Sequence, residues 1–389
     1  MKRPVKTLLC LLLLAAFGPG LLFGCAGKPS ATQMAAGPDW RSLSVLRQVP
    51  LQHAAQFSLT VYDQGYTLLD IPASGRFLII PEGAGLPEGA PDDIVPLYGP
   101  LDRIYLAATS SMDFFRALDR VSAVRLSGTD ANGWYIQEAK DALARGDMVF
   151  AGKYSAPDYE LIFSEKCDLA IESTMIYHSP EVKEQLQKLG VPVLVERSSY
   201  EEDPLGRMEW IKVYGALLGD LDQAEALFDK EVKAVEPLLD QPKTGKTVAF
   251  FYITTTGTVN VRKSDDYVSR MIGLAGGTYA FDDLKGGSAL STVNMTMESF
   301  YDGAKDADLL IYNSTIDGEL FTLEDLLQKS VFLKDFKAVR AGNVWCTGKN
   351  LFQEPMGLGK LILDMHRVLT DETAPNELTY LHKLTTGGK

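Results

Sequence analysis

The sequence predicts an α/β protein with two Rossmann-like lobes, joined by a long linking helix, and with a ligand cleft between the lobes. Residues 204–240 form the longest helical pattern in the chain, and short apolar strands alternate with helices on both sides of it. This alternation is typical of buried parallel sheets. Several of these strands end in segments rich in Ser, Thr, Asn and aromatic residues, and ligands of such sheets bind beyond the carboxyl ends of the strands.

The N-terminal residues have the pattern of an export signal. Basic residues at positions 2, 3 and 6 precede the apolar stretch 8–16, which is too short to span a bilayer comfortably. We therefore expect residues 1–24 to be a signal peptide.

The end of this signal, Leu22-Phe23-Gly24-Cys25, resembles a bacterial lipobox. It predicts cleavage at Cys25 and diacylation of its sulfur, so that buried acyl chains hold the protein on the extracytoplasmic face of a membrane. Residues 25–45 would then be a lipidated tether, rich in Ala, Gly, Ser and Pro in its central part. A plain secretory signal with an incidental Cys is the alternative.

Composition narrows the class of protein. The chain of 389 residues is long enough for two or three domains, and its formal net charge of −13 disfavours a general nucleic-acid binder. Beyond Cys10 and Cys25, the remaining cysteines are Cys167 and Cys346, one in each half, which we expect to be free buried thiols.

The N-terminal lobe is expected to cover residues 46–203. Residues 57–80 predict a leading β-hairpin with an added strand, because turn signals interrupt apolar runs there. The segments after residue 100 then alternate: strands are expected at 103–107, 121–126, 148–151, 168–171 and 191–195, and helices at 112–118, 134–144, 157–164 and 180–189.

The linking helices are expected over residues 204–240. Asp203 before Pro204 is a typical helix start, and Gly219-Asp220 predicts a break before a second helix that runs to about Leu239. The C-terminal lobe would cover residues 246–385. It has predicted strands at 248–253, 308–312 and 344–345, and helices at 267–274, 297–304, 323–329, 333–339 and 356–369.

Several short motifs match a known family. They are Gly152-Lys-Tyr-Ser-Ala-Pro-Asp-Tyr-Glu160, the strand Asp168-Leu-Ala-Ile, Gly190-Val-Pro-Val, Arg207-Met-Glu-Trp-Ile, Leu217-Leu-Gly and Leu274-Ala-Gly-Gly277. Together with the lipobox and the two lobes, the chain from about residue 101 to 369 resembles the solute-binding lipoproteins of bacterial ABC importers, in the class that binds iron–siderophore, haem and cobalamin ligands. This resemblance implies a binding protein that delivers a small-molecule metal chelate to an ABC permease with its ATPase.

The resemblance also implies a docking surface for the permease. In this family one Glu on each lobe meets basic residues of the permease, and by position in the helix before a strand these would be Glu160 and Glu298. Two solvated helix carboxylates are the alternative reading.

The residues after the strands predict the cleft and its ligand. The chain has 16 Tyr, 17 Phe and 4 Trp, and aromatic side chains suit a large, partly polar ligand. Only four His occur, so direct binding of free metal is not expected, and iron would be carried inside an organic chelate. The predicted cleft residues are Ser110, Trp134, Tyr135, Tyr154, Thr174, Tyr177, His178, Tyr200, Thr255, Arg262, Asn313 and Phe352. Arg262 would pair with a carboxylate or catecholate group of the ligand.

The expected function is therefore a membrane-anchored, monomeric binding protein for an iron chelate, either a siderophore or haem, with no cofactor and no catalysis. Cobalamin or another corrinoid is the alternative ligand. A surface-anchored two-lobed hydrolase is the alternative from another class, although Gly-x-Ser-x-Gly is absent from the sequence. A structural lipoprotein with a vestigial cleft is the third possibility.

Overall fold

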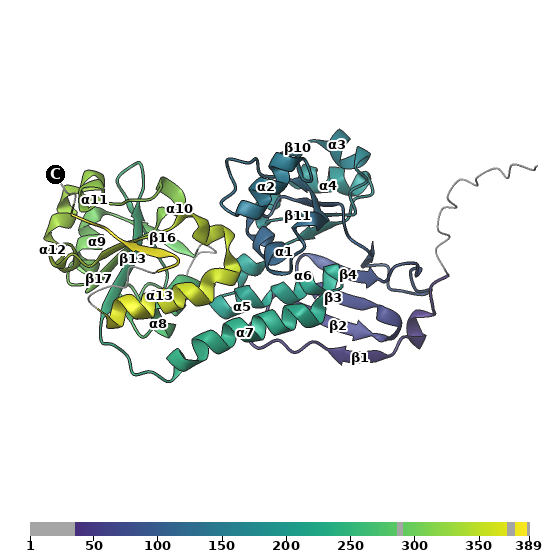
Figure 1. Cartoon of the computed structure of the whole chain (residues 1–389), viewed down its shortest axis with the longest axis horizontal. Coiled ribbons are helices and arrows are strands. Elements are labelled where there is room, and N and C mark those ends of the chain that lie inside the picture. The colour runs from purple at the N-terminus through teal and green to yellow at the C-terminus, as the bar shows by residue number, and fades with distance from the viewer. Residues whose placement is uncertain (1–35, 286–290, 372–377, 387–389) are drawn as a thin grey trace, which may run out of the picture.

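The computed structural model describes residues 36–285, 291–371 and 378–386 (Figure 1). The expected signal peptide, the lipidation site Cys25 and the first part of the tether lie outside the described residues. In Figure 1 the two lobes lie side by side, and the linking helices run beneath them toward a separate sheet at the N-terminal side.

That separate sheet precedes the N-terminal lobe and has five strands in the order β1-β2-β3-β4-β5. The strands are β1 (Val45–Gln48), β2 (Ser58–Tyr62), β3 (Thr67–Ile71), β4 (Gly75–Ile80) and β5 (Ile94–Tyr98). The expected hairpin with an added strand corresponds to β2, β3 and β4. The sequence pattern missed β5, whose Pro96 lacks an N–H and is tolerated because β5 is an edge strand. We call this unit the leading sheet.

The N-terminal lobe contains an all-parallel sheet in the order β12-β11-β6-β7-β8. Its strands are β6 (Ile104–Leu106), β7 (Val124–Ser127), β8 (Val149–Phe150), β11 (Leu169–Glu172) and β12 (Val193–Val195). The connecting helices are α1 (Met112–Ala117), α2 (Gln137–Arg145), α3 (Tyr159–Ser164) and α4 (Pro180–Lys188), with a small hairpin of β9 (Gly152–Lys153) and β10 (Ala156–Pro157).

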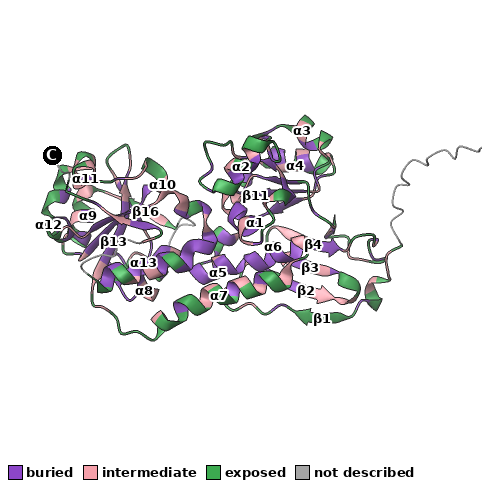
Figure 2. Cartoon of the chain, viewed as in Figure 1, coloured by how far each residue is buried: buried purple, intermediate pink, exposed green. Residues whose placement is uncertain are grey.

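The linking segment consists of α5 (Pro204–Glu209), α6 (Ile211–Leu218) and α7 (Leu221–Leu239). Asp203 caps α5 by accepting from the N–H of Leu205, and Gly219 ends α6 in a left-handed conformation with φ of 78°. Nearly all of α5 and α6 is buried, as Figure 2 shows, because α6 packs between the leading sheet and the N-terminal lobe. Tyr214 of α6 stacks on Phe114 of α1, with 4.7 Å between ring centroids.

The C-terminal lobe contains a mixed sheet in the order β16-β14-β13-β17-β18-β19, with β15 beside β13. The central strands β13 (Thr247–Ile253), β17 (Leu309–Tyr312) and β18 (Val344–Thr347) are parallel. The sequence analysis missed the flanking strands β14 (Val259–Arg262), β15 (Thr278–Tyr279), β16 (Thr292–Met295) and β19 (Leu381–Lys383). Of these, β14, β16 and β19 pair in antiparallel fashion. These strands contain polar residues, so they lack the continuous apolar stretch by which a buried parallel strand is recognised in a sequence.

The helices of the C-terminal lobe are α8 (Tyr267–Leu274), α9 (Met297–Ala304), α10 (Ser314–Asp317), α11 (Leu323–Lys329), α12 (Lys337–Ala341) and α13 (Leu358–Thr370). Helix α13 packs against α5, α7 and α8, so the last helix of the chain returns to the linking segment. One hydrophobic core therefore extends from the leading sheet through the linking helices into the C-terminal lobe.

The two remaining cysteines are buried and free, as predicted. Burial raises the pKa of Cys167 to about 11 and that of Cys346 to about 12, so both stay protonated at neutral pH.

Glu172, the last residue of β11, is an unusual buried carboxyl group. Its side chain is fully buried, and neither carboxyl oxygen has a hydrogen-bond partner among the residues that the structure describes. Burial raises its pKa from 4.5 to about 8. In the unfolded chain this group ionises near its ordinary pKa, whereas the folded protein keeps it protonated until about pH 8. The contribution of Glu172 to the free energy of unfolding therefore decreases as pH rises through the window from 4.5 to about 8.

We predict that Glu172→Gln, which keeps the shape but removes the titration, makes the protein more stable at pH 8 than the wild type. Each pH unit in the window costs the wild type up to about 1.4 kcal/mol, so the gain at about pH 5 is much smaller. Urea unfolding at several pH values measures this difference, with Glu184→Gln on the exposed side of α4 as the control. A gain that does not vary with pH would contradict the assignment.

Candidate ligand cleft

The strand ends of the two lobes come together above the linking helices. On the N-terminal lobe, three short 3-10 helices follow the carboxyl ends of β6, β11 and β12: η3 (Thr109–Ser111), η5 (Thr174–His178) and η6 (Ser198–Tyr200). On the C-terminal lobe, residues 254–258 follow β13, α10 follows β17, and η8 (Lys349–Gln353) follows β18. Because η3 and η8 contact each other, the carboxyl-end edges of the two sheets face a common space, where ligands of such sheets generally bind.

Gln353 bridges the lobes at one end of this space. Its Oε1 accepts from the N–H of Tyr135 at 2.7 Å, and its Nε2 donates to the carbonyl of Gly133 at 2.7 Å. The side chain is 1% exposed, so both hydrogen bonds are shielded from water. The rings of Tyr135 and Phe352 meet edge to face beside it, with 5.9 Å between centroids.

A second contact behind Gln353 involves ionisable groups. Asp113 on α1 accepts from the N–H of Met356 at 2.8 Å and pairs with Arg116. Burial raises the pKa of Asp113 to about 6 even though Arg116 opposes the shift. On the C-terminal side, Tyr380 donates to Glu354 at 2.6 Å. The segment after η8 is thus anchored in both lobes.

The opposite end of the space is closed by contacts between the linking segment and α8. Arg270 of α8 forms an ion pair with Glu202 at 2.5 Å. The guanidinium of Arg207 on α5 lies over the ring of Tyr267, 3.6 Å from its centroid. These contacts surround a cavity of about 370 Å³, whose lining includes Ser199, Tyr200, Arg207, Lys263, Tyr267 and Ser291.

Arg207 has a fixed orientation within this cavity. Its Nε donates to the carbonyl of Glu201 at 3.0 Å and its Nη2 to the carbonyl of Ser199 at 2.6 Å. Burial lowers the pKa of Arg207 from its ordinary value of 12.5, while Asp266 and Glu196 oppose this shift. An arginine guanidinium keeps its charge in proteins. Nearby, the guanidinium of Arg197 lies 4.2 Å from the ring centroid of Tyr200.

Four of the predicted aromatic residues are exposed near the strand ends. The exposed fractions are 37% for Tyr135, 44% for Tyr177, 48% for Tyr200 and 42% for Phe352. Only Tyr200 lines the 370 Å³ cavity. The hydroxyl of Tyr177 donates to the carbonyl of Ala73 at 3.2 Å, so this ring is held against the β3–β4 turn of the leading sheet.

Two predicted cleft residues are buried instead. Trp134 is 0% exposed, and its indole N–H donates to Thr129 and Ser127 within the N-terminal lobe. Asn313 is also buried, and its side chain accepts from Thr315 as the N-cap of α10. Neither side chain lines a cleft in this structure, because each satisfies polar groups of its own lobe.

The other predicted residues are distributed over the strand ends. Ser110, Tyr154 and Thr174 are partly buried, and His178 and Thr255 are exposed. Arg262 ends β14 and lies 3.6 Å from Asp266, which already supplies a counterion. Glu160 and Glu298 are exposed in the first turns of α3 and α9.

The sequence analysis missed three residues that organise the cleft: Arg207, Tyr267 and Gln353. Arg207 was included only in a family motif of the linking helix, and Tyr267 only as the first residue of a helix. Gln353 lies in an irregular segment. No periodic pattern marks such positions, because their roles come from contacts between distant parts of the chain.

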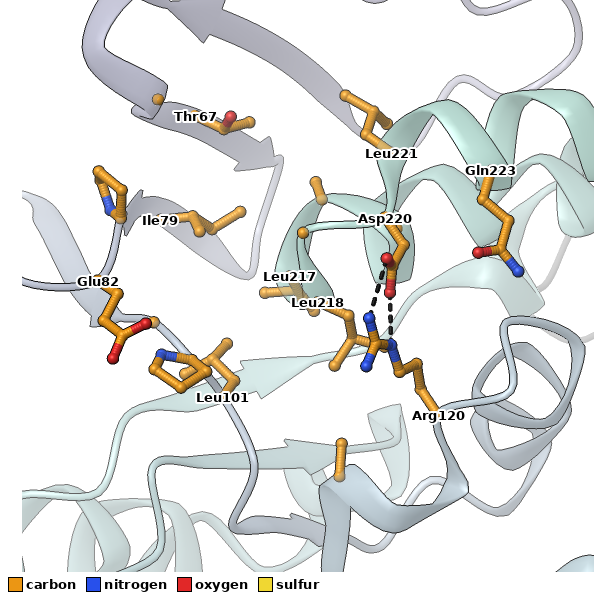
Figure 3. Close-up of a pocket in the computed structure, with 18 of the residues that line it drawn as sticks. Thr67, Ile79, Glu82, Leu101, Arg120, Leu217, Leu218, Asp220, Leu221 and Gln223 are labelled. Atoms are coloured by element: carbon orange, nitrogen blue, oxygen red, sulfur yellow. Dashed lines mark hydrogen bonds and ion pairs between the residues drawn. The ribbon is translucent and has the colours of Figure 1, made fainter.

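A larger cavity, of about 810 Å³, lies elsewhere, between the leading sheet and the turn joining α6 and α7 (Figure 3). Leu101 and Asp102 precede β6, and Ser122 and Ala123 precede β7, so this cavity lies at the amino ends of the strands. Its Arg120 is already paired with Asp220 at 2.6 Å. Ligands of parallel sheets bind at the carboxyl ends, which favours the cleft between the lobes.

Three of the four histidines contact groups away from the cleft. His53 Nδ1 lies 2.8 Å from Asp203, His366 Nδ1 lies 3.0 Å from the carbonyl of Ala275, and His382 Nε2 lies 2.8 Å from that of Leu320. Within the described ranges, no group of three or more His, Cys, Asp or Glu residues is arranged to hold a metal ion. None of the helices in the described part of the chain is long and apolar enough to cross a membrane.

Two α/β lobes on a helical linker, with strand ends facing a shared cleft, define a two-lobed solute-binding protein. The chain belongs to the periplasmic binding protein family, whose model matches residues 107–351. Two uncharacterised lipoproteins of Methanocaldococcus jannaschii are each 25% identical to it over 366 and 356 residues. The matches cover 85% and 86% of this chain and 84% and 86% of those proteins.

Solved structures share the fold at low sequence identity. A periplasmic haem-binding protein from Pseudomonas aeruginosa aligns with a TM-score of 0.57 and 18% identity, covering 74% of this chain and 99% of that one. A petrobactin-binding protein from Bacillus subtilis aligns with a TM-score of 0.54 and 14% identity, and the alignment covers 69% of this chain and 92% of that one. The leading sheet precedes the residues matched by the family model.

We predict that Gln353→Ala weakens the contact between the lobes. The substitution leaves the N–H of Tyr135 and the carbonyl of Gly133 without their partner, which costs about 1–3 kcal/mol in the free energy of unfolding. Urea unfolding measures the loss, and spin labels on the two lobes measure the expected increase in their separation.

Gln137→Ala is the matched control, because that exposed amide donates to Asp141 on the same helix and not across the lobes. Unchanged stability and unchanged separation for Gln353→Ala would show that the bridge does not hold the lobes.

Proposed function

We propose that this protein captures an iron chelate, either a siderophore or haem, outside the cell and delivers it to an ABC permease. The observation that carries the proposal is the cleft between the strand ends of the two lobes, beside which aromatic side chains remain exposed. Tyr and Phe offer flat apolar faces, and Tyr adds a hydroxyl, so such a surface suits a large ligand with both apolar and polar groups.

The names of structural neighbours support this class of ligand. Proteins of the same fold are described as a haem-binding protein, a petrobactin-binding protein and part of an Fe3+-hydroxamate transport system. A direct metal site has less support, because the described residues offer no convergent set of His, Cys and carboxylate ligands.

Membrane anchoring through Cys25 is part of the proposal. It is supported by the lipobox-like sequence before Cys25 and by the relatives that are named lipoproteins. A diacylated N-terminus would hold the binding protein close to its permease on the extracytoplasmic face.

We propose further that Glu160 and Glu298 dock onto the permease. Both are exposed, and each lies in the first turn of its helix on a different lobe. Two carboxylates on separate lobes would let basic residues of a permease contact both lobes at once.

Titration of the purified protein with ferric siderophores, haem and cyanocobalamin tests the ligand. We expect a ferric chelate or haem to bind with sub-micromolar affinity, measured by calorimetry, and to raise the melting temperature by mass action. Native mass spectrometry of protein purified from its host would show the same ligand retained. Binding of cyanocobalamin alone would overturn the iron assignment.

Charge reversal tests docking separately. Glu160→Lys combined with Glu298→Lys should abolish stimulation of the permease ATPase in reconstituted vesicles and leave calorimetric ligand affinity within about twofold. Glu184→Lys, on exposed α4, is the control. Normal stimulation by the double variant would rule out this docking surface.

A further inference from the structure

We infer that the ligand presents a pair of anionic oxygens to the cleft and that Arg207 binds them. This inference rests on the proposed function, because it concerns the same cleft, and it adds the charge of the ligand and the residue that recognises it.

The first observation is that Arg207 is held in a fixed orientation and makes no direct ion pair with a described residue, although Asp266 and buried Glu196 attract its charge at longer range. Two of its nitrogens donate to the backbone carbonyls of Glu201 and Ser199, and its flat face lies against the ring of Tyr267. Among the residues that the structure describes, no carboxylate lies within 4 Å of its guanidinium. The side chain therefore brings a positive charge to the cavity in a fixed orientation, without an ion-pair partner.

A second arginine repeats this arrangement beside the same cavity. Arg197 lies over the ring of Tyr200, and its Nη2 makes a long contact of 3.5 Å with the side-chain oxygen of Gln56. Its Nε is buried and has no hydrogen-bond partner in the described structure. A buried guanidinium N–H without an acceptor is costly, and a ligand oxygen would remove that cost.

Carboxylates also line the cavity, but three of the four are engaged. Glu201 accepts from the N–H groups of Ala55 and Gln56 and from the indole of Trp210. Glu202 pairs with Arg270 and Asp266 with Arg262, while Asp265 is exposed to solvent.

These pairings explain why Arg262 is not the anchor that the sequence analysis expected. Its charge is balanced by Asp266, which is also the N-cap of α8. Arg207, from the linking segment, lines the cavity between the lobes and forms no direct ion pair with any residue in the described part of the chain. A guanidinium in a partly buried site binds planar oxyanions such as carboxylates and catecholates through two parallel hydrogen bonds.

Metal-free anions test the inference without any assumption about iron. We expect citrate and 2,3-dihydroxybenzoate to raise the melting temperature of the wild type, and Arg207→Gln to lose this response. Arg207→Lys keeps the positive charge but lacks the planar, paired N–H donors of a guanidinium. We expect it to retain only a small part of the rise in melting temperature. Arg145→Gln, an exposed arginine at the end of α2, is the matched control and should respond as the wild type does. Equal responses of wild type and Arg207→Gln, or no response of the wild type, would overturn the inference.

Ferric chelates of different charge separate this inference from the proposed function. Wild type should bind a ferric tris-catecholate at least about tenfold more tightly than a charge-neutral ferric trishydroxamate, and Arg207→Gln should lose this preference. If both chelates bind equally to both proteins, the proposed function stands and the inference fails. If citrate and 2,3-dihydroxybenzoate raise the melting temperature of the wild type but not of Arg207→Gln, and no ferric chelate or haem binds, the inference stands and the iron assignment fails.

Discussion

Two buried carboxylates hold the leading sheet, the linking helix and the cleft in one arrangement. Glu209 accepts from the N–H groups of residues 52–54 and from Lys212, and Glu201 accepts from those of residues 55 and 56 and from Trp210. A buried carboxylate is stable only when such donors replace its hydration. If the segment 52–56 left the start of the linking helix, the two buried carboxylates would lose these backbone donors and keep the side chains of Lys212 and Trp210 as partners.

The orientation of Arg207 depends on the same segment. The carboxylate of Glu201 holds residues 55 and 56, while its carbonyl holds the Nε of Arg207. Arg207 in turn reaches Tyr267 of the C-terminal lobe, and Gln353 reaches back to the N-terminal lobe at the other end of the cleft. With a contact between lobes at each end, motion that widens the cleft must break one of them. These contacts preform the cleft, which limits the conformational entropy that the protein would lose on binding a ligand.

The regular parts of the fold could be predicted from sequence, and the contacts between lobes could not. The bounds predicted for α8 and α11 agree with the structure, and the parallel strands lie where apolar runs follow helices. Antiparallel strands such as β14 and β19 were missed because polar residues interrupt their apolar runs. At the cleft, a pattern places a residue near a strand end but does not give the direction of its side chain. For this reason Trp134 and Tyr135, adjacent in sequence, were both expected in the cleft, yet Trp134 is in the core and Tyr135 is exposed.

The leading sheet also reaches the strand ends that shape the cleft. Its β3–β4 turn accepts a hydrogen bond from Tyr177 through the carbonyl of Ala73, and Ser74 accepts from the N–H of Val195 at 2.9 Å. This turn precedes the part of the chain that the family model matches. Relatives without such a sheet must support the same loops by other means. Two members of the family with the same cleft-facing residues can therefore differ in selectivity, because substitutions in the leading sheet can shift the loops that it supports.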